Sequence, residues 1–142
     1  MKKIVYCFFI LMIGCTVKSE FSINDWAYFR GNNEVNHYKP YNQINIDNVH
    51  LLKKAWEFNV NDFDRENRSQ IQCNPLVIDG ILFGTSAKMK LLALNASTGK
   101  KLWEFDPYDN NYTTHGTGVN RGINYHRDSK GDRILYATYS NL

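Results

Sequence analysis

The chain has 142 residues and a mass of 16.6 kDa, enough for one domain at most, and its 43% hydrophobic and 22% charged residues exclude an intrinsically disordered protein. Aromatic residues reach 14% and there are 17 Asn, so the composition predicts short strands joined by turns and excludes a helical bundle. The net charge of +3 includes two lysines of a predicted leader, and the remaining 15 − 14 = +1 gives no basic surface for nucleic acid.

The N-terminus has the pattern of an export signal. Two lysines precede the apolar run Ile4–Ile13, which is too short to span a bilayer. Met12-Ile13-Gly14-Cys15 resembles the bacterial lipobox, so we expect residues 1–14 to be a signal peptide and Cys15 to be the lipidated first mature residue. The chain is then exported to the periplasmic side and anchored to the outer or inner membrane. Ordinary signal cleavage nearby, or a buried N-terminal strand, is the alternative.

The cysteines predict no disulfide within the mature chain. Cys7 leaves with the leader and Cys15 is blocked by lipid, so only Cys73 remains. Cys73 has no Cys or His at metal-ligand spacing, which favours a small buried apolar residue over a metal ligand.

Between the leader and residue 69 the elements are weakly marked. We expect a strand over Trp26–Gly31, a short helical turn capped by Asp47, and a strand over Ala55–Val60. Residues 61–69 are polar, have no apolar period and predict a loop.

The region 75–105 predicts a four-stranded antiparallel sheet. Apolar runs alternate here with tight-turn sequences, of which Asp79-Gly80 is the strongest hairpin signal. The predicted strands are Pro75–Ile78, Ile81–Thr85, Lys90–Leu94 and Lys101–Phe105. Such a sheet has two open edges and needs neighbours.

A partial repeat follows this sheet. Asp132–Thr138 aligns with Asp79–Thr85 at an offset of 132 − 79 = 53 residues. A four-strand unit recurring at this spacing indicates a β-propeller. Since propellers close with roughly four to eight blades, we expect the chain to be part of a longer protein or a truncated gene product, with about one and a half blades.

One motif resembles a known repeat. Ala93, Asn95, Thr98-Gly99 and Trp103 have the spacing of the tryptophan-docking repeat of eight-bladed quinoprotein propellers, with Asn95 in place of the usual acidic residue. The resemblance implies an all-β, eight-bladed propeller. It does not imply activity by itself, because non-enzymatic propeller lipoproteins of outer-membrane assembly carry the same repeat, and such a scaffold is the alternative function.

Further segments resemble the pyrroloquinoline quinone (PQQ)-dependent sugar and alcohol dehydrogenases in particular. They are Trp26–Gly31, Tyr38–Trp56, Ser69–Gly80 and Val119–Tyr125, and they follow the family's order and spacing over most of residues 24–142. The resemblance implies that residues 15–142 are the incomplete N-terminal portion of such a propeller.

Departures from the alcohol enzymes favour the glucose or aldose type. His115-Gly116 stands where the alcohol enzymes carry adjacent cysteines, Gln72 where methanol-type enzymes carry Glu, and Tyr125-His126 where the alcohol enzymes have Tyr-Trp. The implied substrate is glucose or a related sugar or alcohol, and the implied electron acceptor is a respiratory quinone or cytochrome c.

The resemblance also implies the site residues. PQQ carries three carboxylates and an o-quinone, and the guanidinium of Arg121 suits a carboxylate. Gln72, Asn120 and Gly122 are implied to bind the same cofactor, and His115 and His126 are candidates for the pocket. The plainer interpretations are a surface ion pair for Arg121, a buried polar turn residue for Gln72, and solvated loop histidines.

The expected chemistry is the family's. An Asp base removes the alcohol proton, hydride passes to the quinone, and calcium polarises the quinone. The catalytic Asp and the calcium ligands are implied to lie beyond residue 142, so no catalytic or metal-binding residue is assigned within the chain. The carboxylates of its polar loops are interpreted as solvated turn residues. The 142 residues alone are therefore expected to fold poorly and to be inactive.

Overall fold

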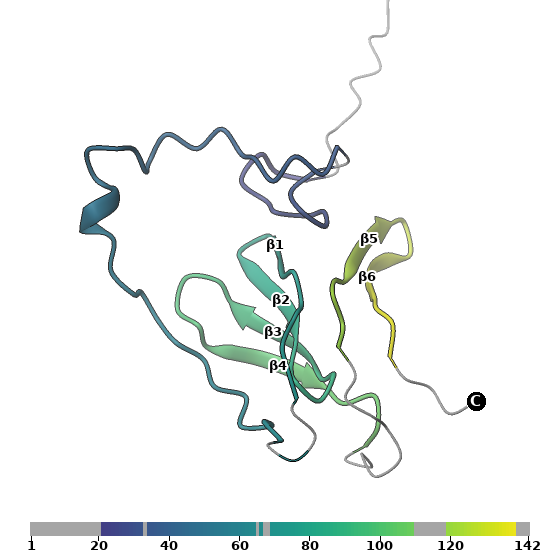
Figure 1. Ribbon diagram of the computed structural model, residues 1–142. Helices are drawn as coiled ribbons and strands as arrows, with labels where there is room; N and C mark the ends of the chain where they lie inside the picture. The colour runs from purple at the N-terminus through teal and green to yellow at the C-terminus, as the bar shows by residue number, and fades with distance from the viewer. Residues whose placement is uncertain (1–20, 33, 65, 67–68, 110–118, 139–142) are drawn as a thin grey trace, which may run out of the picture.

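The computed structural model describes residues 21–32, 34–64, 66, 69–109 and 119–138. The leader, Cys15 and His115 lie outside the described residues. Within those residues the elements are a 3-10 helix η1 (Val49–Leu51) and the strands β1 (Leu76–Ile78), β2 (Ile81–Thr85), β3 (Leu91–Asn95), β4 (Lys101–Phe105), β5 (Asn124–Asp128) and β6 (Gly131–Leu135). A four-stranded sheet and a separate hairpin lie side by side (Figure 1).

The four-stranded sheet confirms the prediction for residues 75–105. Its strands follow chain order, β1-β2-β3-β4, and every neighbouring pair is antiparallel. The first turn forms because Asp79 and Gly80 both adopt positive φ, +50° and +75°, as a two-residue hairpin turn requires. The predicted third strand is shifted by one residue, from Lys90–Leu94 to Leu91–Asn95.

The docking motif builds the turn between β3 and β4. The side-chain Oδ1 of Asn95 accepts hydrogen bonds from the backbone N–H groups of Ser97 and Thr98, at 3.1 and 3.0 Å, and from the Thr98 hydroxyl at 3.0 Å. The turn ends at Gly99, whose φ of +71° suits a residue without a side chain. Asn95 can replace an acidic residue here because the turn needs only an oxygen acceptor.

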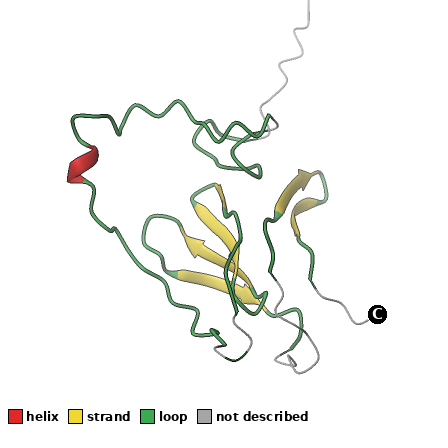
Figure 2. Ribbon diagram, in the orientation of Figure 1, coloured by secondary structure: helices red, strands yellow, loops and turns green. Residues whose placement is uncertain are grey.

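The second sheet is the β5–β6 hairpin, which packs against the first sheet (Figure 2). The core between the two sheets is continuous, and its fully buried side chains are Leu76, Ile78 and Ile123. Phe83 of β2 lies 5.7 Å, centroid to centroid, from Tyr125 of β5. Two antiparallel sheets stacked in this way are consistent with neighbouring propeller blades.

The second hairpin pairs over five positions and the first over three, so its turn lies earlier in the chain than the repeat alone predicts. The β5–β6 turn lies at residues 129–130, where the Asp128 carboxylate accepts the Lys130 N–H at 2.8 Å and Gly131 takes a φ of +114°. Strand β6 begins at Gly131, and Ile134 and Tyr136 pack on the core as Ile81 and Phe83 do, at the predicted offset of 134 − 81 = 53 residues.

The strand predicted over Trp26–Gly31 does not form. Only Trp26 joins the sheet, through an isolated antiparallel bridge to Val77. Positive φ values of +61° at Arg30 and +103° at Gly31 turn the chain away, so an extended run cannot continue. The segment instead covers the core, with Ala27 buried.

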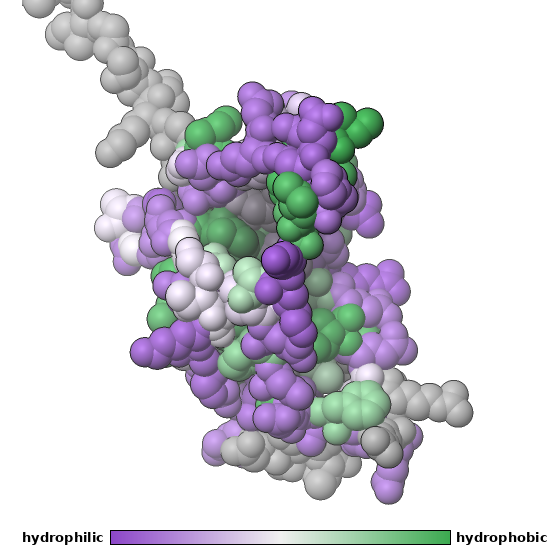
Figure 3. All heavy atoms as spheres, turned by 90° about the vertical axis from the view of Figure 1, so that its left-hand side faces the viewer, coloured by the Kyte–Doolittle hydropathy of each residue, from purple (hydrophilic) through white to green (hydrophobic). Residues whose placement is uncertain are grey.

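The helical turn and the second early strand are also corrected. Asp47 does not cap η1: the N-cap position belongs to Asn48, whose side chain accepts the Asn45 N–H at 2.8 Å rather than capping the helix. Residues 53–60 are extended, and exposure alternates over 55–60, but none pairs its backbone with another described residue. Figure 3 faces the side of the molecule along which this part of the chain runs, and green apolar side chains lie there among purple polar ones.

Candidate functional site

Two segments that are distant in sequence meet immediately before β1 and β5. Asn74 and Gly122 form an isolated parallel bridge, so the segment that contains Gln72 lies beside the segment that contains Arg121. The carbonyl oxygen of Arg121 accepts two hydrogen bonds from Asn74, one from the backbone N–H at 3.1 Å and one from the side-chain Nδ2 at 2.8 Å. The structure thus brings together Gln72 and Arg121, two residues that the resemblance predicts as cofactor ligands, on neighbouring segments.

Asn120, the residue before Arg121, fixes the backbone on the other side of Arg121 through its side chain. Its side chain is buried, its Oδ1 accepts the Gly122 N–H at 2.9 Å, and its Nδ2 donates to the Ala137 carbonyl at 3.0 Å. The carboxamide therefore ties the turn at Arg121 to the chain that follows β6. A buried amide satisfied in this way stabilises one backbone conformation.

Gly122 lies against an aromatic ring. A Cβ atom at this position would come within 2.7 Å of Cδ2 of Phe29. Among the described residues, the group nearest to this position is the Phe29 ring. A side chain at position 122 would displace Phe29 and the N-terminal segment that carries it.

Arg121 and Gln72 present exposed side chains at this junction. Nε2 of Gln72 donates to Oε1 of Gln70 at 2.8 Å. The Arg121 guanidinium makes no hydrogen bond or ion pair with any residue that the structure describes. A permanently charged planar donor on a fixed backbone, with a carboxamide on the neighbouring segment, fits a ligand that carries carboxylates, as PQQ does.

Of the two histidines predicted for the pocket, only His126 is among the described residues. His115 lies outside them. His126 is in the middle of β5, opposite Arg133, and its Nε2 is 3.3 Å from an oxygen of Asp128 in the same strand. Its side chain is exposed, and its assignment to the pocket stays a prediction.

A charged cluster joins the two hairpin turns. Arg127 of β5 donates to Asp79 at 2.6 Å and to Asp132 at 2.9 Å, and the Tyr125 hydroxyl donates to Asp132 at 2.6 Å. The hydrogen bond from Arg127, reinforced by Tyr125, lowers the pKa of Asp132, and the two carboxylates raise the pKa of Arg127. This cluster lies at the turn end of the hairpins, whereas Arg121 precedes β5, so its role is to join the two sheets.

Two further properties concern ions and membranes. The described residues contain no group of three or more His, Cys, Asp or Glu side chains that could hold a metal ion. They also include no helix that is long and apolar enough to cross a membrane.

Sequence reasoning missed Asn74 and Phe29. Both lie in segments that carried the family resemblance, but their contacts are with backbone atoms of Arg121 and Gly122, far away in the sequence. A polar side chain directly before Pro75, at the beginning of a buried strand, was the available signal for Asn74.

Comparison with known proteins places the chain in a family. Residues 26–142 match the family described as PQQ: Glucose/ethanol/alcohol dehydrogenase, beta-propeller domain. The chain is 33% identical over 105 residues to the quinoprotein glucose dehydrogenase of Escherichia coli, covering 72% of this chain and 13% of the relative. It is 40% identical over 83 residues to the dehydrogenase subunit of the quinone-dependent alcohol dehydrogenase of Gluconobacter oxydans, covering 58% and 10%.

A third relative is the quinoprotein glucose dehydrogenase A of Acinetobacter calcoaceticus, 34% identical over 87 residues, with 59% of this chain and 11% of the relative covered. The chain thus spans about a tenth of the length of these relatives. The all-β architecture and the stacked antiparallel sheets agree with the family's propeller. The chain therefore belongs to the β-propeller family of PQQ-dependent glucose, ethanol and alcohol dehydrogenases.

Proposed function

We propose that this chain forms part of the cofactor-binding face of a quinoprotein dehydrogenase that oxidises glucose or a related sugar or alcohol. The observation that carries the proposal is the exposed guanidinium of Arg121, held on a backbone fixed by Asn74 and Asn120 and next to the Gln72 segment. When bound, PQQ supplies an o-quinone that accepts hydride from the substrate. Arg121 holds a cofactor carboxylate, and Gln72 donates to the same edge of the cofactor.

For the substrate, we propose glucose or another aldose. The support comes from the residues in which the chain departs from the alcohol enzymes, namely Gln72, His115-Gly116 and Tyr125-His126. The similar relatives include both glucose and alcohol dehydrogenases, so they leave this choice to experiment. Calcium, the catalytic Asp and a respiratory electron acceptor complete the proposed enzyme.

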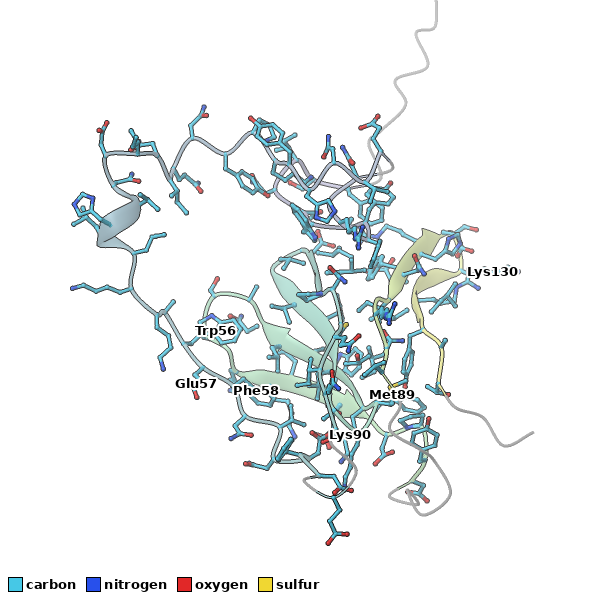
Figure 4. The ribbon with its side chains drawn as sticks, in the orientation of Figure 1. Trp56, Glu57, Phe58, Met89, Lys90 and Lys130 are labelled. Carbon is cyan, nitrogen blue, oxygen red and sulfur yellow. The ribbon has the colours of Figure 1, made fainter. Side chains whose placement is uncertain are left out.

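The cofactor assignment is tested on the full-length protein that the gene encodes. PQQ is titrated into it with calcium present, and the absorbance of bound PQQ is followed. Arg121→Ala removes a charged hydrogen bond, and we expect the Kd for PQQ to rise by about 10- to 150-fold. The matched control is Lys130→Ala, because Lys130 is an exposed cation at the tip of the β5–β6 hairpin (Figure 4). Equal PQQ binding by wild type and Arg121→Ala contradicts the assignment. A wild-type protein that binds no PQQ favours the non-catalytic scaffold.

We also propose that the protein is exported and held at a membrane by lipid on Cys15. The support is the lysine pair, the apolar run and the Gly14-Cys15 pair of the leader. Radiolabelled palmitate should enter the wild-type chain and not a Cys15→Ser variant. Equal labelling of both would refute the lipid anchor and leave ordinary signal cleavage.

A further inference from the structure

We propose that Asn74 is a positioning residue for Arg121, and that its side-chain amide sets the direction from which the Arg121 guanidinium meets the cofactor. The proposal rests on the proposed function of Arg121 as a PQQ ligand. Asn74 itself is not assigned a contact with the cofactor. It acts through the peptide group that follows Arg121.

The contact fixes that peptide group from one side. A carbonyl oxygen has two lone pairs, and both donors of Asn74 reach the carbonyl of Arg121, at 3.1 Å from the backbone and 2.8 Å from the side chain. The backbone bond persists whatever side chain stands at position 74. The side-chain bond is therefore the part that a substitution can remove without breaking the bridge to Gly122.

Asn74 is also well anchored. Pro75 follows it, which restricts Asn74 to extended conformations, and Leu76 at the start of β1 is fully buried. The first sheet thus provides a rigid base from which the amide reaches a residue of the next unit. On the other side of Arg121, Asn120 fixes the N–H of Gly122, so two carboxamides from different units hold one arginine.

The chemistry of an amide suits this place. Nδ2 donates to a carbonyl oxygen and is neutral, so it does not compete with a cofactor carboxylate for the guanidinium. An Asp of the same size would offer only acceptors to the Arg121 carbonyl and would bring a negative charge close to Arg121. A hydrocarbon side chain would leave the backbone bond alone to hold the peptide group.

The experiment is a double-mutant cycle on PQQ affinity, in the protein as its gene encodes it. If Asn74 acts through Arg121, Asn74→Ala raises the Kd for PQQ by about 3- to 10-fold in the wild-type background, the size of one neutral hydrogen bond. In the Arg121→Ala background the same substitution changes the Kd by less than about 2-fold, because the group that it positions is gone. Asn59→Ala is the matched control, since Asn59 is an exposed Asn outside the segments that carry the resemblance, and it should bind PQQ as wild type does.

A second readout separates positioning from folding. The thermal unfolding of each apo protein is measured beside its PQQ titration. A separate variant, Asn74→Asp, keeps the size of the side chain and should bind PQQ at least as weakly as Asn74→Ala. Wild-type affinity in Asn74→Ala, or an equal loss in both Arg121 backgrounds, overturns the proposal. If Arg121→Ala weakens binding and Asn74→Ala does not, only the positioning role fails. If the wild type binds no PQQ, the proposed function fails and this inference with it.

Discussion

A five-residue sequence occurs twice in the chain, once as a paired strand and once as an unpaired segment. Lys54-Ala55-Trp56-Glu57-Phe58 and Lys101-Leu102-Trp103-Glu104-Phe105 match at four of five positions. The second copy is strand β4, paired along β3, with 42% of Trp103 exposed. The first copy pairs with no described strand, yet its indole is docked: a Cβ on Gly99 would lie 2.5 Å from Trp56 Cε3, and Nε1 donates to the Ala96 carbonyl at 3.0 Å.

The comparison separates two interactions that a propeller blade needs. Backbone pairing makes β4 a strand, and it requires a neighbouring edge with free N–H and C=O groups. Docking of the indole requires only a turn without a side chain, and the β3–β4 turn offers one at Gly99. Figure 4 shows Trp56 beside this turn. The same sequence therefore supplies a strand in one place and an anchor in the other.

Removing the anchor has the largest expected effect. Trp56→Ala loses the half-buried ring and its hydrogen bond to Ala96, and should reduce the free energy of unfolding by about 2–4 kcal/mol. Trp56→Phe keeps a ring and loses only the donor, so about 1 kcal/mol is expected. Urea unfolding followed by circular dichroism measures both. An unchanged midpoint in Trp56→Ala would show that the docked indole contributes nothing to stability.

The contact between Trp56 and the β3–β4 turn can be tested by comparing substitutions at two glycines. Gly99 and Gly80 have similar φ values, +71° and +75°, but a Cβ on Gly80 meets no atom within 4 Å. Gly80→Ala should therefore cost only the backbone strain, about 1 kcal/mol, whereas Gly99→Ala should cost about 2–3 kcal/mol because it also displaces Trp56. In a Trp56→Ala background the two costs should become equal. Equal costs in the wild type would contradict the docking contact.

The sheet could be predicted and the early segments could not, for one physical reason. Strands β1 to β4 are joined by tight turns whose residue types dictate their geometry, as Asp79-Gly80 and Asn95 illustrate. Residues 55–60 have the same alternation but no adjacent turn, so their state depends on a partner strand that local sequence does not specify. In Trp26–Gly31 the positive φ of Arg30, a residue that rarely adopts it, could not be read from the residue types.

The candidate site was predicted in part. The resemblance predicted Gln72 and Arg121 as cofactor ligands, and the structure adds the bridge between their segments. Asn74 escaped notice because its bond to Arg121 joins a side chain to a backbone carbonyl 47 residues later, and such a contact leaves no periodic pattern. Asn120 was predicted to bind the cofactor, and this stays a prediction; the structure shows that its amide groups bond to Gly122 and Ala137.

The smallest expected effect is that of salt on stability. Salt should weaken the ion pairs near the β5–β6 turn but not the contact of Trp56 with the β3–β4 turn. Arg127 joins Asp79 to Asp132, and all three side chains are partly exposed. Such ion pairs contribute little each and weaken with salt. Raising salt to about 1 M should therefore loosen the hairpin slightly and leave the Trp56 contact unchanged.

The direction of the pH effect follows from Asp132. Arg127 and Tyr125 hold the pKa of Asp132 below its usual range, so the folded state favours the carboxylate. The stabilisation is fully present above the unfolded pKa of about 4 and is lost as pH falls through the lower folded pKa. The thermal midpoint of the wild type should exceed that of Asp132→Asn at pH 7, and the difference should shrink below about pH 4. Subtracting the variant removes the titration of every other carboxylate. A difference that stays constant down to pH 3 would mean that Asp132 stabilises the hairpin by packing and hydrogen bonding rather than by charge.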